Sequence, residues 1–129
     1  MGSYLIDTNT VIDLLGGLLP PHVISWLDTR ILAKDIYVSV INEIELLGFN
    51  SSPQDAQDLQ DLINNVTVLE LKRDIVNQTI ALKRIKRIKL PDAVIAATAL
   101  VHNLTIISRN TSDFKNITGL TCLDPYTDI

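Results

Sequence analysis

Short apolar runs suited to β-strands alternate with segments of helical spacing along most of this chain. The strand-like runs are rich in Val, Ile, Leu and Tyr, and polar or turn-forming residues lie between them and the helical segments. They lie at residues 3–7, 36–41, 66–71, 104–108 and 120–123. Strands that alternate with helices are typical of a parallel sheet with helices on both faces. The sequence therefore predicts an α/β fold.

The segment PDAVIAATALVHN, residues 91–103, carries apolar residues on nearly every side. A helix of that composition is buried. Pro91 suits its first turn, and Asn103 suits the left-handed residue that ends it. Other helices are expected at residues 8–17, 20–28, 42–49, 51–65 and 73–86, the last of them ending near Lys89.

The length of 129 residues, 47% of them hydrophobic and 20% charged, suits a single globular domain spanning residues 1–129. Because Cys122 is the only cysteine, no internal disulfide can form, and we interpret Cys122 as a small near-core residue. The sequence has no apolar run of roughly 18 residues and no charged-then-apolar leader. These features predict a cytoplasmic protein with no membrane role.

Acidic residues outnumber basic ones, and the formal net charge is -4. This balance argues against a generic nucleic-acid binder. The basic residues are unevenly placed, however, because residues 83–89, KRIKRIK, hold five of the eleven. A local positive strip therefore exists within an acidic chain.

Acidic side chains follow three of the predicted strands and begin the buried helix. Asp7 ends the first strand, Glu43 or Glu45 follows the second, Asp92 lies in the first turn of the buried helix, and Asp113 follows the fourth strand. In a parallel sheet these positions meet at one edge. Each acid also has a simple structural explanation, as a helix cap, a favourable charge at a helix start or a turn residue. Their combination is what indicates a site.

Carboxylates that converge repel one another unless they take up protons or bind a cation. Oxygen ligands without histidine or cysteine favour Mg²⁺ or Mn²⁺, and His22 and His102 lie where capping or surface roles are expected. Such carboxylate-held metals recur in phosphodiester cleavage. The motifs of phosphate-binding loops and dinucleotide folds are absent, and Asn9 replaces the second aspartate that a haloacid-dehalogenase-like phosphatase needs. A receiver domain would need an acidic pair and a late lysine, neither of which is evident.

Three segments together resemble a PIN domain, specifically the VapC-type toxins of toxin–antitoxin pairs. They are YLIDTNTVIDLL (4–15), SVINEIELLG (39–48) and LPDAVIAATALVHNLTIISRNTSDF (90–114), in the family's order and spacing. The resemblance implies a three-layer α/β/α domain with a short parallel sheet. It also implies a Mg²⁺- or Mn²⁺-dependent endoribonuclease that is held inactive by a cognate VapB-type antitoxin and usually forms a homodimer.

Carried over by position, the resemblance makes Asp7, Asp92 and Asp113 catalytic residues and metal ligands. The matching polar residues that support them are Thr8, Asn9, Ser108 and Asn110. The chain departs from the pattern at Asn42, where threonine or serine is common, and at Asn103, where glycine is common. Both substitutions suit cap roles, so activity is still expected.

The second acid is ambiguous on residue spacing alone. Glu43 and Glu45 point about 200° apart on a helix, so they cannot both face one site. Asn42 and Glu45 also have the spacing of a capping box, a purely structural alternative. The resemblance favours Glu45, because the family pattern of serine, small polar residue and glutamate-leucine falls here on Ser39, Asn42 and Glu45.

Two questions about nucleic acid are left open by the sequence. Arg84 and Arg87 are expected to share a helix face, with Ile85 and Ile88 on another, and this face is either solvated or binds RNA phosphates. The main functional hypothesis is an active toxin nuclease. The alternative is a PIN-like RNA- or protein-binding module with little catalytic activity.

Overall fold

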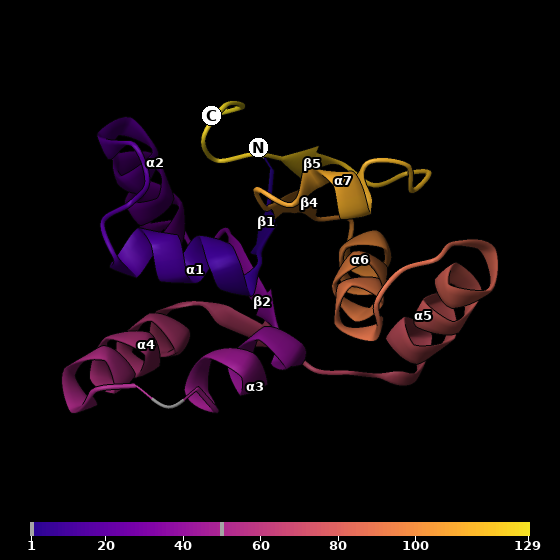
Figure 1. Ribbon diagram of the computed structural model, residues 1–129, viewed down its shortest axis with the longest axis horizontal. Coiled ribbons are helices and arrows are strands. Elements are labelled where there is room, and N and C mark those ends of the chain that lie inside the picture. The colour runs from indigo at the N-terminus through magenta and orange to yellow at the C-terminus, as the bar shows by residue number, and fades with distance from the viewer. Residues whose placement is uncertain (1, 50) are drawn as a thin grey trace.

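The structure, a computed structural model, describes residues 2–49 and 51–129. Strands and helices alternate from one end of the chain to the other (Figure 1). The strands are β1 (Tyr4–Ile6), β2 (Ile36–Ser39), β3 (Thr67–Leu69), β4 (Thr105–Ile107) and β5 (Cys122–Leu123). The helices are α1 (Thr8–Leu15), α2 (Pro21–Leu32), α3 (Val40–Leu47), α4 (Pro53–Asn65), α5 (Arg73–Ile85), α6 (Leu90–His102) and α7 (Thr111–Phe114).

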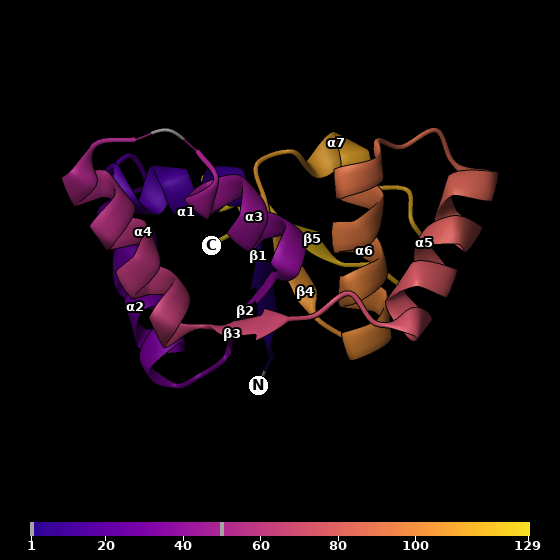
Figure 2. The same cartoon turned by 90° about the horizontal axis from the view of Figure 1, so that it is seen from below.

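The strands form one sheet in the order β3-β2-β1-β4-β5, and every neighbouring pair is parallel. Helices α1, α2 and α4 lie on one side of the sheet, and α5 and α6 lie on the other (Figure 2). The predicted three-layer α/β/α fold with a short parallel sheet is confirmed. Because all strands run the same way, their carboxyl ends share one edge, from which α1, α3 and α7 begin.

Two hydrophobic cores fill the spaces between the sheet and its helices. One joins Ile6 of β1 and Val38 of β2 to Val11 of α1 and Leu27 of α2. The other joins the opposite sheet face to α5 and α6, and it includes the six apolar residues of the stretch Ala93 to Ala99, all of which is buried. Helix α6 is therefore buried through its middle, as its composition predicts. Its alanines allow it to pack closely against α5.

Several boundaries differ from those expected. Strand β2 ends at Ser39, and the apolar Val40 and Ile41 belong to α3, because the Ser39 hydroxyl accepts a hydrogen bond from the Ile41 amide and caps that helix. Helix α7 was not predicted, since four residues give no period to detect. Asn103 has a left-handed backbone, with φ of 55°, and ends α6 as expected.

Cys122 is half-buried at the outer strand β5. Burial and, in smaller part, the charges of Asp7 and Asp124 raise the pKa of its thiol to about 12. The thiol is therefore protonated and unreactive near neutral pH, which agrees with the structural role expected from the sequence. Within the described residues, no helix has the length and apolar character required to cross a membrane.

Candidate active site

Asp7 lies at the carboxyl end of the central strand β1 and is nearly fully buried, with 7% exposure. One carboxylate oxygen, Oδ1, accepts a hydrogen bond from the Thr10 amide at 2.9 Å and so caps α1. The other, Oδ2, accepts one from the Ser108 hydroxyl at 2.5 Å. Asp7 is thus both a helix cap and an acid at the predicted site, and Ser108 links it to the end of β4.

Asp92 and Asp113 come from the first turn of α6 and from α7. Burial, the charge and hydrogen bond of Asp113, and the charge of Asp7 together raise the pKa of Asp92 from 3.8 to about 6. Two of the other candidate acids therefore lie close enough to Asp92 to act on its carboxyl group. Asn110 orients Asp113 through a short hydrogen bond from its side-chain amide.

Glu45 reaches the same edge through Thr8, the residue after Asp7. The Thr8 hydroxyl donates to Glu45 Oε1 at 2.9 Å and accepts a hydrogen bond from Asn42 Nδ2 at 3.1 Å. Asn42 also accepts a hydrogen bond from the Ser39 amide at 2.9 Å. The relay of Asn42, Thr8 and Glu45 therefore fixes the start of α3 against the start of α1.

The capping box of α3 pairs Ser39 with Asn42. The alternative in which Asn42 pairs with Glu45 is therefore wrong, and the Glu45 carboxylate is left to contact Thr8. Glu43 lies in the first turn of α3, and within the described residues its side chain forms no hydrogen bond. The structure places Glu45, and not Glu43, beside the segment that carries Asp7.

The remaining supporting residues are placed less uniformly. Ser108 is fully buried, and its oxygen also accepts a hydrogen bond from the Asn110 amide at 3.0 Å. Asn9 is exposed, and its side chain forms no hydrogen bond with the part of the chain that the structure describes. The two histidines lie away from the acids, since His22 contacts the Ile129 carbonyl and His102 lies at the far end of α6 from Asp92.

The expectation for Arg84 and Arg87 is wrong in one respect. Helix α5 ends at Ile85, and Lys86 has an extended backbone, so the two arginines do not share a helix face. Ile85 is 83% exposed while Ile88 is buried, so these isoleucines do not form one stripe either. The β-like conformation of Lys86 breaks the periodicity that the sequence suggested.

A buried acid that sequence reasoning missed lies behind the site. Asp13 of α1 is 3% exposed, and its Oδ2 accepts hydrogen bonds from Arg109 at 3.2 Å and from the Tyr126 hydroxyl at 2.7 Å. Arg109 stands between Ser108 and Asn110 in the sequence. The signal available in advance was an aspartate inside the apolar run TVIDLL, which needs a partner when it is buried.

A cleft of about 750 Å³ opens beside Glu45, between α1, α3 and the start of α4. Four of its large apolar side chains are each more than 40% exposed, namely Ile12, Leu15, Ile44 and Phe49. Contiguous exposed apolar side chains next to polar groups are characteristic of binding surfaces. The cleft could not be predicted from the sequence, because its walls come from segments separated in the chain.

The acid cluster suits a hard divalent cation by its donor chemistry, since all four candidate ligands are carboxylates. In the described residues, however, no group of three or more acidic, histidine or cysteine side chains is already arranged to hold a metal ion. Burial and the neighbouring acids raise the pKa of Asp92, and the charge of Lys89 opposes them only in part. The residues fit a cation in chemistry and charge, but their side chains would have to rearrange to surround one.

A family model described as PIN domain matches residues 4–120, most of the chain. The chain belongs to the PIN domain family. PIN domains are generally nucleases, and they typically depend on divalent metal ions. A comparison with curated proteins found no match.

Solved structures similar to this PIN domain come from toxin–antitoxin complexes. A chain of a toxin–antitoxin complex from Klebsiella pneumoniae is 30% identical, with a TM-score of 0.76 over 96% of this chain and 98% of that one. A chain of VapBC-1 from nontypeable Haemophilus influenzae is 27% identical, with a TM-score of 0.74 over 95% and 97%. DNA-bound VapBC from Salmonella typhimurium, at 21% identity and a TM-score of 0.79 over 97% and 99%, shows the fold alone. The resemblance to VapC-type PIN domains is confirmed.

Proposed function

We propose that this PIN domain is a Mg²⁺- or Mn²⁺-dependent endoribonuclease that acts in the cytoplasm as the toxin of a toxin–antitoxin pair. The observation that carries the proposal is the meeting of acids from separate segments at one sheet edge. Asp7 and Asp113 both act on the Asp92 carboxyl group there, and Glu45 contacts Thr8, the residue after Asp7. Binding alone gives no reason to hold so many carboxylates together.

Asp7, Asp92, Glu45 and Asp113 are the residues that would hold the metal ion. When bound, the ion supplies positive charge that readies a water for attack and offsets the charge of the leaving oxygen. Ser108 and Thr10 fix the Asp7 carboxylate, and Thr8 fixes that of Glu45, so these acids lose little freedom when an ion or RNA binds. Asn110 holds Asp113 in the same way.

The cleft beside Glu45 is the proposed docking site for a VapB-type antitoxin. Its exposed apolar side chains, including Ile44 and Phe49, suit the apolar face of an amphipathic helix. A helix bound there would lie against Glu45 and Thr8 and would restrict entry of RNA to the acids. The similar structures named above come from toxin–antitoxin complexes. We also propose that this chain forms a homodimer, as the family resemblance implies.

Cleavage of RNA by matched glutamate variants tests the nuclease function. The purified chain is freed of metal with EDTA, supplied with Mg²⁺ or Mn²⁺, and incubated with total tRNA whose fragments are resolved on a denaturing gel. Glu45→Gln removes a proposed ligand and should reduce cleavage at least a hundredfold. Glu43→Gln removes the same charge from the same helix and should retain it.

Cleavage that persists in EDTA would contradict the metal requirement. Equal activity of the two glutamine variants would contradict the assignment of Glu45. If neither these variants nor the unaltered protein cuts RNA while all of them bind it, the chain is a binding module, which is the alternative hypothesis. Sedimentation at micromolar concentration checks the homodimer independently.

A further inference from the structure

We propose that the turn between α5 and α6 binds the ribose-phosphate backbone of RNA and guides it toward the acid cluster. This basic turn is defined by its exposed or half-exposed side chains Arg84, Ile85, Lys86, Arg87, Lys89 and Leu90. The inference rests on the proposed ribonuclease function and adds to it the surface that holds the substrate.

Within the described residues, no ion pair neutralises the charge of the basic turn. Two ion pairs form among the described residues, Arg30 with Asp35 and Arg109 with Asp13, and neither involves this turn. The turn nevertheless concentrates basic residues in a chain whose net charge is -4. Like charges held together repel one another, so their grouping favours a polyanionic ligand.

The conformation of the turn presents these cations outward. Lys83 donates from Nζ to the Ile88 carbonyl at 2.6 Å, which fixes the loop that follows α5. Residues 83–88 line a shallow hollow of about 450 Å³. With Lys83 used internally, Arg84 and Arg87 remain to contact an anion there. Phosphate oxygens are suitable ligands because a guanidinium can donate two parallel hydrogen bonds to them.

The position of the turn relative to the acids supports RNA as the ligand. In Figure 2 the connection from α5 to α6 lies at the same end of the molecule as α7 and the start of α6. Lys89 acts electrostatically on Asp92 and lowers its pKa against the other influences. A chain of phosphates that crosses the acid cluster can therefore continue onto the basic turn without leaving this end of the protein.

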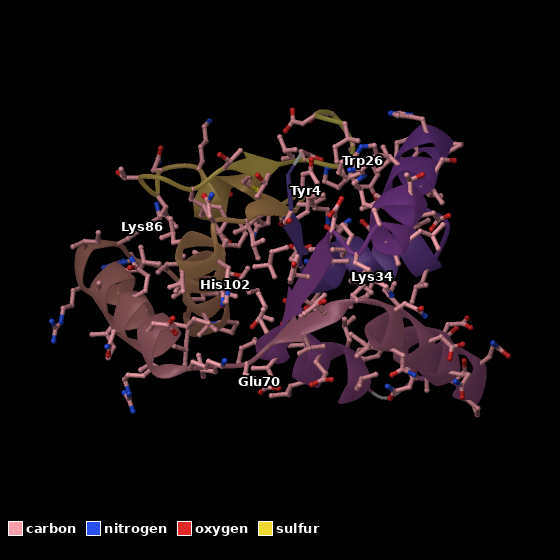
Figure 3. All side chains as sticks on the ribbon, turned by 180° about the vertical axis from the view of Figure 1, so that it is seen from behind. Tyr4, Trp26, Lys34, Glu70, Lys86 and His102 are labelled. Atoms are coloured by element: carbon pink, nitrogen blue, oxygen red, sulfur yellow. The ribbon has the colours of Figure 1, made fainter. Side chains whose placement is uncertain are left out.

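Exposed apolar side chains within the turn add a second kind of contact. Ile85 is 83% exposed and Leu90 is 61% exposed, and both stand among the cations. Apolar side chains beside phosphate-binding cations suit the faces of sugars and unstacked bases in single-stranded RNA. Figure 3 shows Lys86 on the flank opposite Trp26, so this surface is separate from the α2 side of the molecule.

A matched pair of double variants tests the proposal in the Glu45→Gln background, which is expected to bind RNA without cutting it. Arg84→Gln/Arg87→Gln removes two charges from the basic turn, and Lys72→Gln/Arg73→Gln removes two from the other end of α5, about 18 Å away. Each double variant shifts the net charge from -4 to -6, so both share the same long-range effect. Binding of a fluorescein-labelled 20-nucleotide RNA hairpin is followed by anisotropy from 50 to 200 mM KCl.

Loss of two phosphate contacts should lower the slope of log Kd against log[KCl] by roughly 1.4 for the basic-turn variant. The parent protein then loses about sevenfold more affinity than this variant over that fourfold salt range. The control variant should change the slope by less than half as much. Equal slopes for the two double variants would overturn the proposal. So would an equal loss of binding to poly-glutamate and to RNA by the basic-turn variant, because the turn would then bind anions or proteins in general.

Cleavage by the otherwise unaltered protein separates this inference from the proposed function. Arg84→Gln/Arg87→Gln should raise KM for the hairpin at least fivefold and leave kcat nearly unchanged. A dinucleotide, whose single phosphate is held at the acids while it is cut, should be cut equally by both proteins. A protein that cuts neither RNA refutes the nuclease function, whereas an unchanged KM for the hairpin refutes the role of the turn.

Discussion

Replacement of Asn42 by alanine should weaken both the fold and the proposed site. Asn42 is fully buried at the start of α3, and its side-chain amide serves two elements at once. Its oxygen accepts from the Ser39 amide at 2.9 Å, and its nitrogen donates to the Thr8 hydroxyl at 3.1 Å. Asn42→Ala therefore removes the Asn42 half of the capping box of α3 and the partner that orients Thr8 toward Glu45.

The expected loss of stability follows from those two hydrogen bonds. A buried polar group that loses its partner costs about 1–3 kcal/mol, and the Ser39 amide is buried while the Thr8 hydroxyl is half-exposed. We expect Asn42→Ala to lower the free energy of unfolding by about 2–4 kcal/mol. For a chain of this length that corresponds to a melting temperature lower by about 8–15 °C.

Thr8→Val is the matched control, because it removes only the hydroxyl and leaves the contact between Ser39 and Asn42 in place. It should cost about 1 kcal/mol of stability. Thr8→Val removes the donor to Glu45, and Asn42→Ala removes the partner that orients that donor, so both variants should slow RNA cleavage by about 10- to 100-fold. Calorimetry and a gel cleavage assay below both melting temperatures measure the two effects. A stability loss under 1 kcal/mol for Asn42→Ala would refute the stabilising role of the two Asn42 hydrogen bonds. Full activity of Thr8→Val would refute the role of the Thr8 hydroxyl in orienting Glu45.

Two further predictions concern the acids themselves. In EDTA, the raised pKa of Asp92 means that its protonated form favours folding, so this contribution is present below pH 4 and lost as the pH rises through about 6. Asp92→Asn should therefore stabilise the metal-free protein by about 1–2 kcal/mol at pH 7.5, after discounting for solvent screening, and by little at pH 4. Urea titrations at the two pH values measure the free energy of unfolding, and an equal increase at both would contradict this prediction. Asp7→Ala should lower the melting temperature more than Asp92→Ala does, because Asp7 accepts two hydrogen bonds from neutral donors. Calorimetry measures both melting temperatures, and the reverse order would show that charge repulsion at Asp7 outweighs these two hydrogen bonds.

The layers of the fold were predictable because they depend on periodicity and composition. β-Branched runs indicated the strands, and the apolar segment 91–103 indicated a buried helix, α6. Boundaries were less accessible where a single side chain decides them. The Ser39 cap ends β2 two residues early, and the extended Lys86 ends α5 before the sequence pattern stops. Each of these two boundaries depends on one hydrogen bond or one backbone angle. A hydrophobic pattern in the sequence predicts neither.

For the candidate site, the sequence located the segments but not the contacts between them. Residues that follow parallel strands gather at one edge whatever their identity, so the neighbourhood of Asp7, Asp92 and Asp113 follows from topology. The choice of Glu45 over Glu43 needed a family resemblance. Residue spacing shows that the two side chains point in different directions, but it does not show which of them faces the site. The partners of Asp13 were out of reach, since Arg109 and Tyr126 are about a hundred residues away in the chain.

Three of the four acids accept a hydrogen bond from a neutral side chain. Ser108 donates to Asp7, Thr8 to Glu45 and Asn110 to Asp113. A neutral donor stabilises the charged form of a carboxyl group, which offsets part of the repulsion from its neighbours. In the described part of the chain, no neutral side chain donates to Asp92, and burial together with the charges of Asp113 and Asp7 raises its pKa to about 6. The charge state of Asp92 should therefore respond when a cation or RNA enters this edge of the sheet.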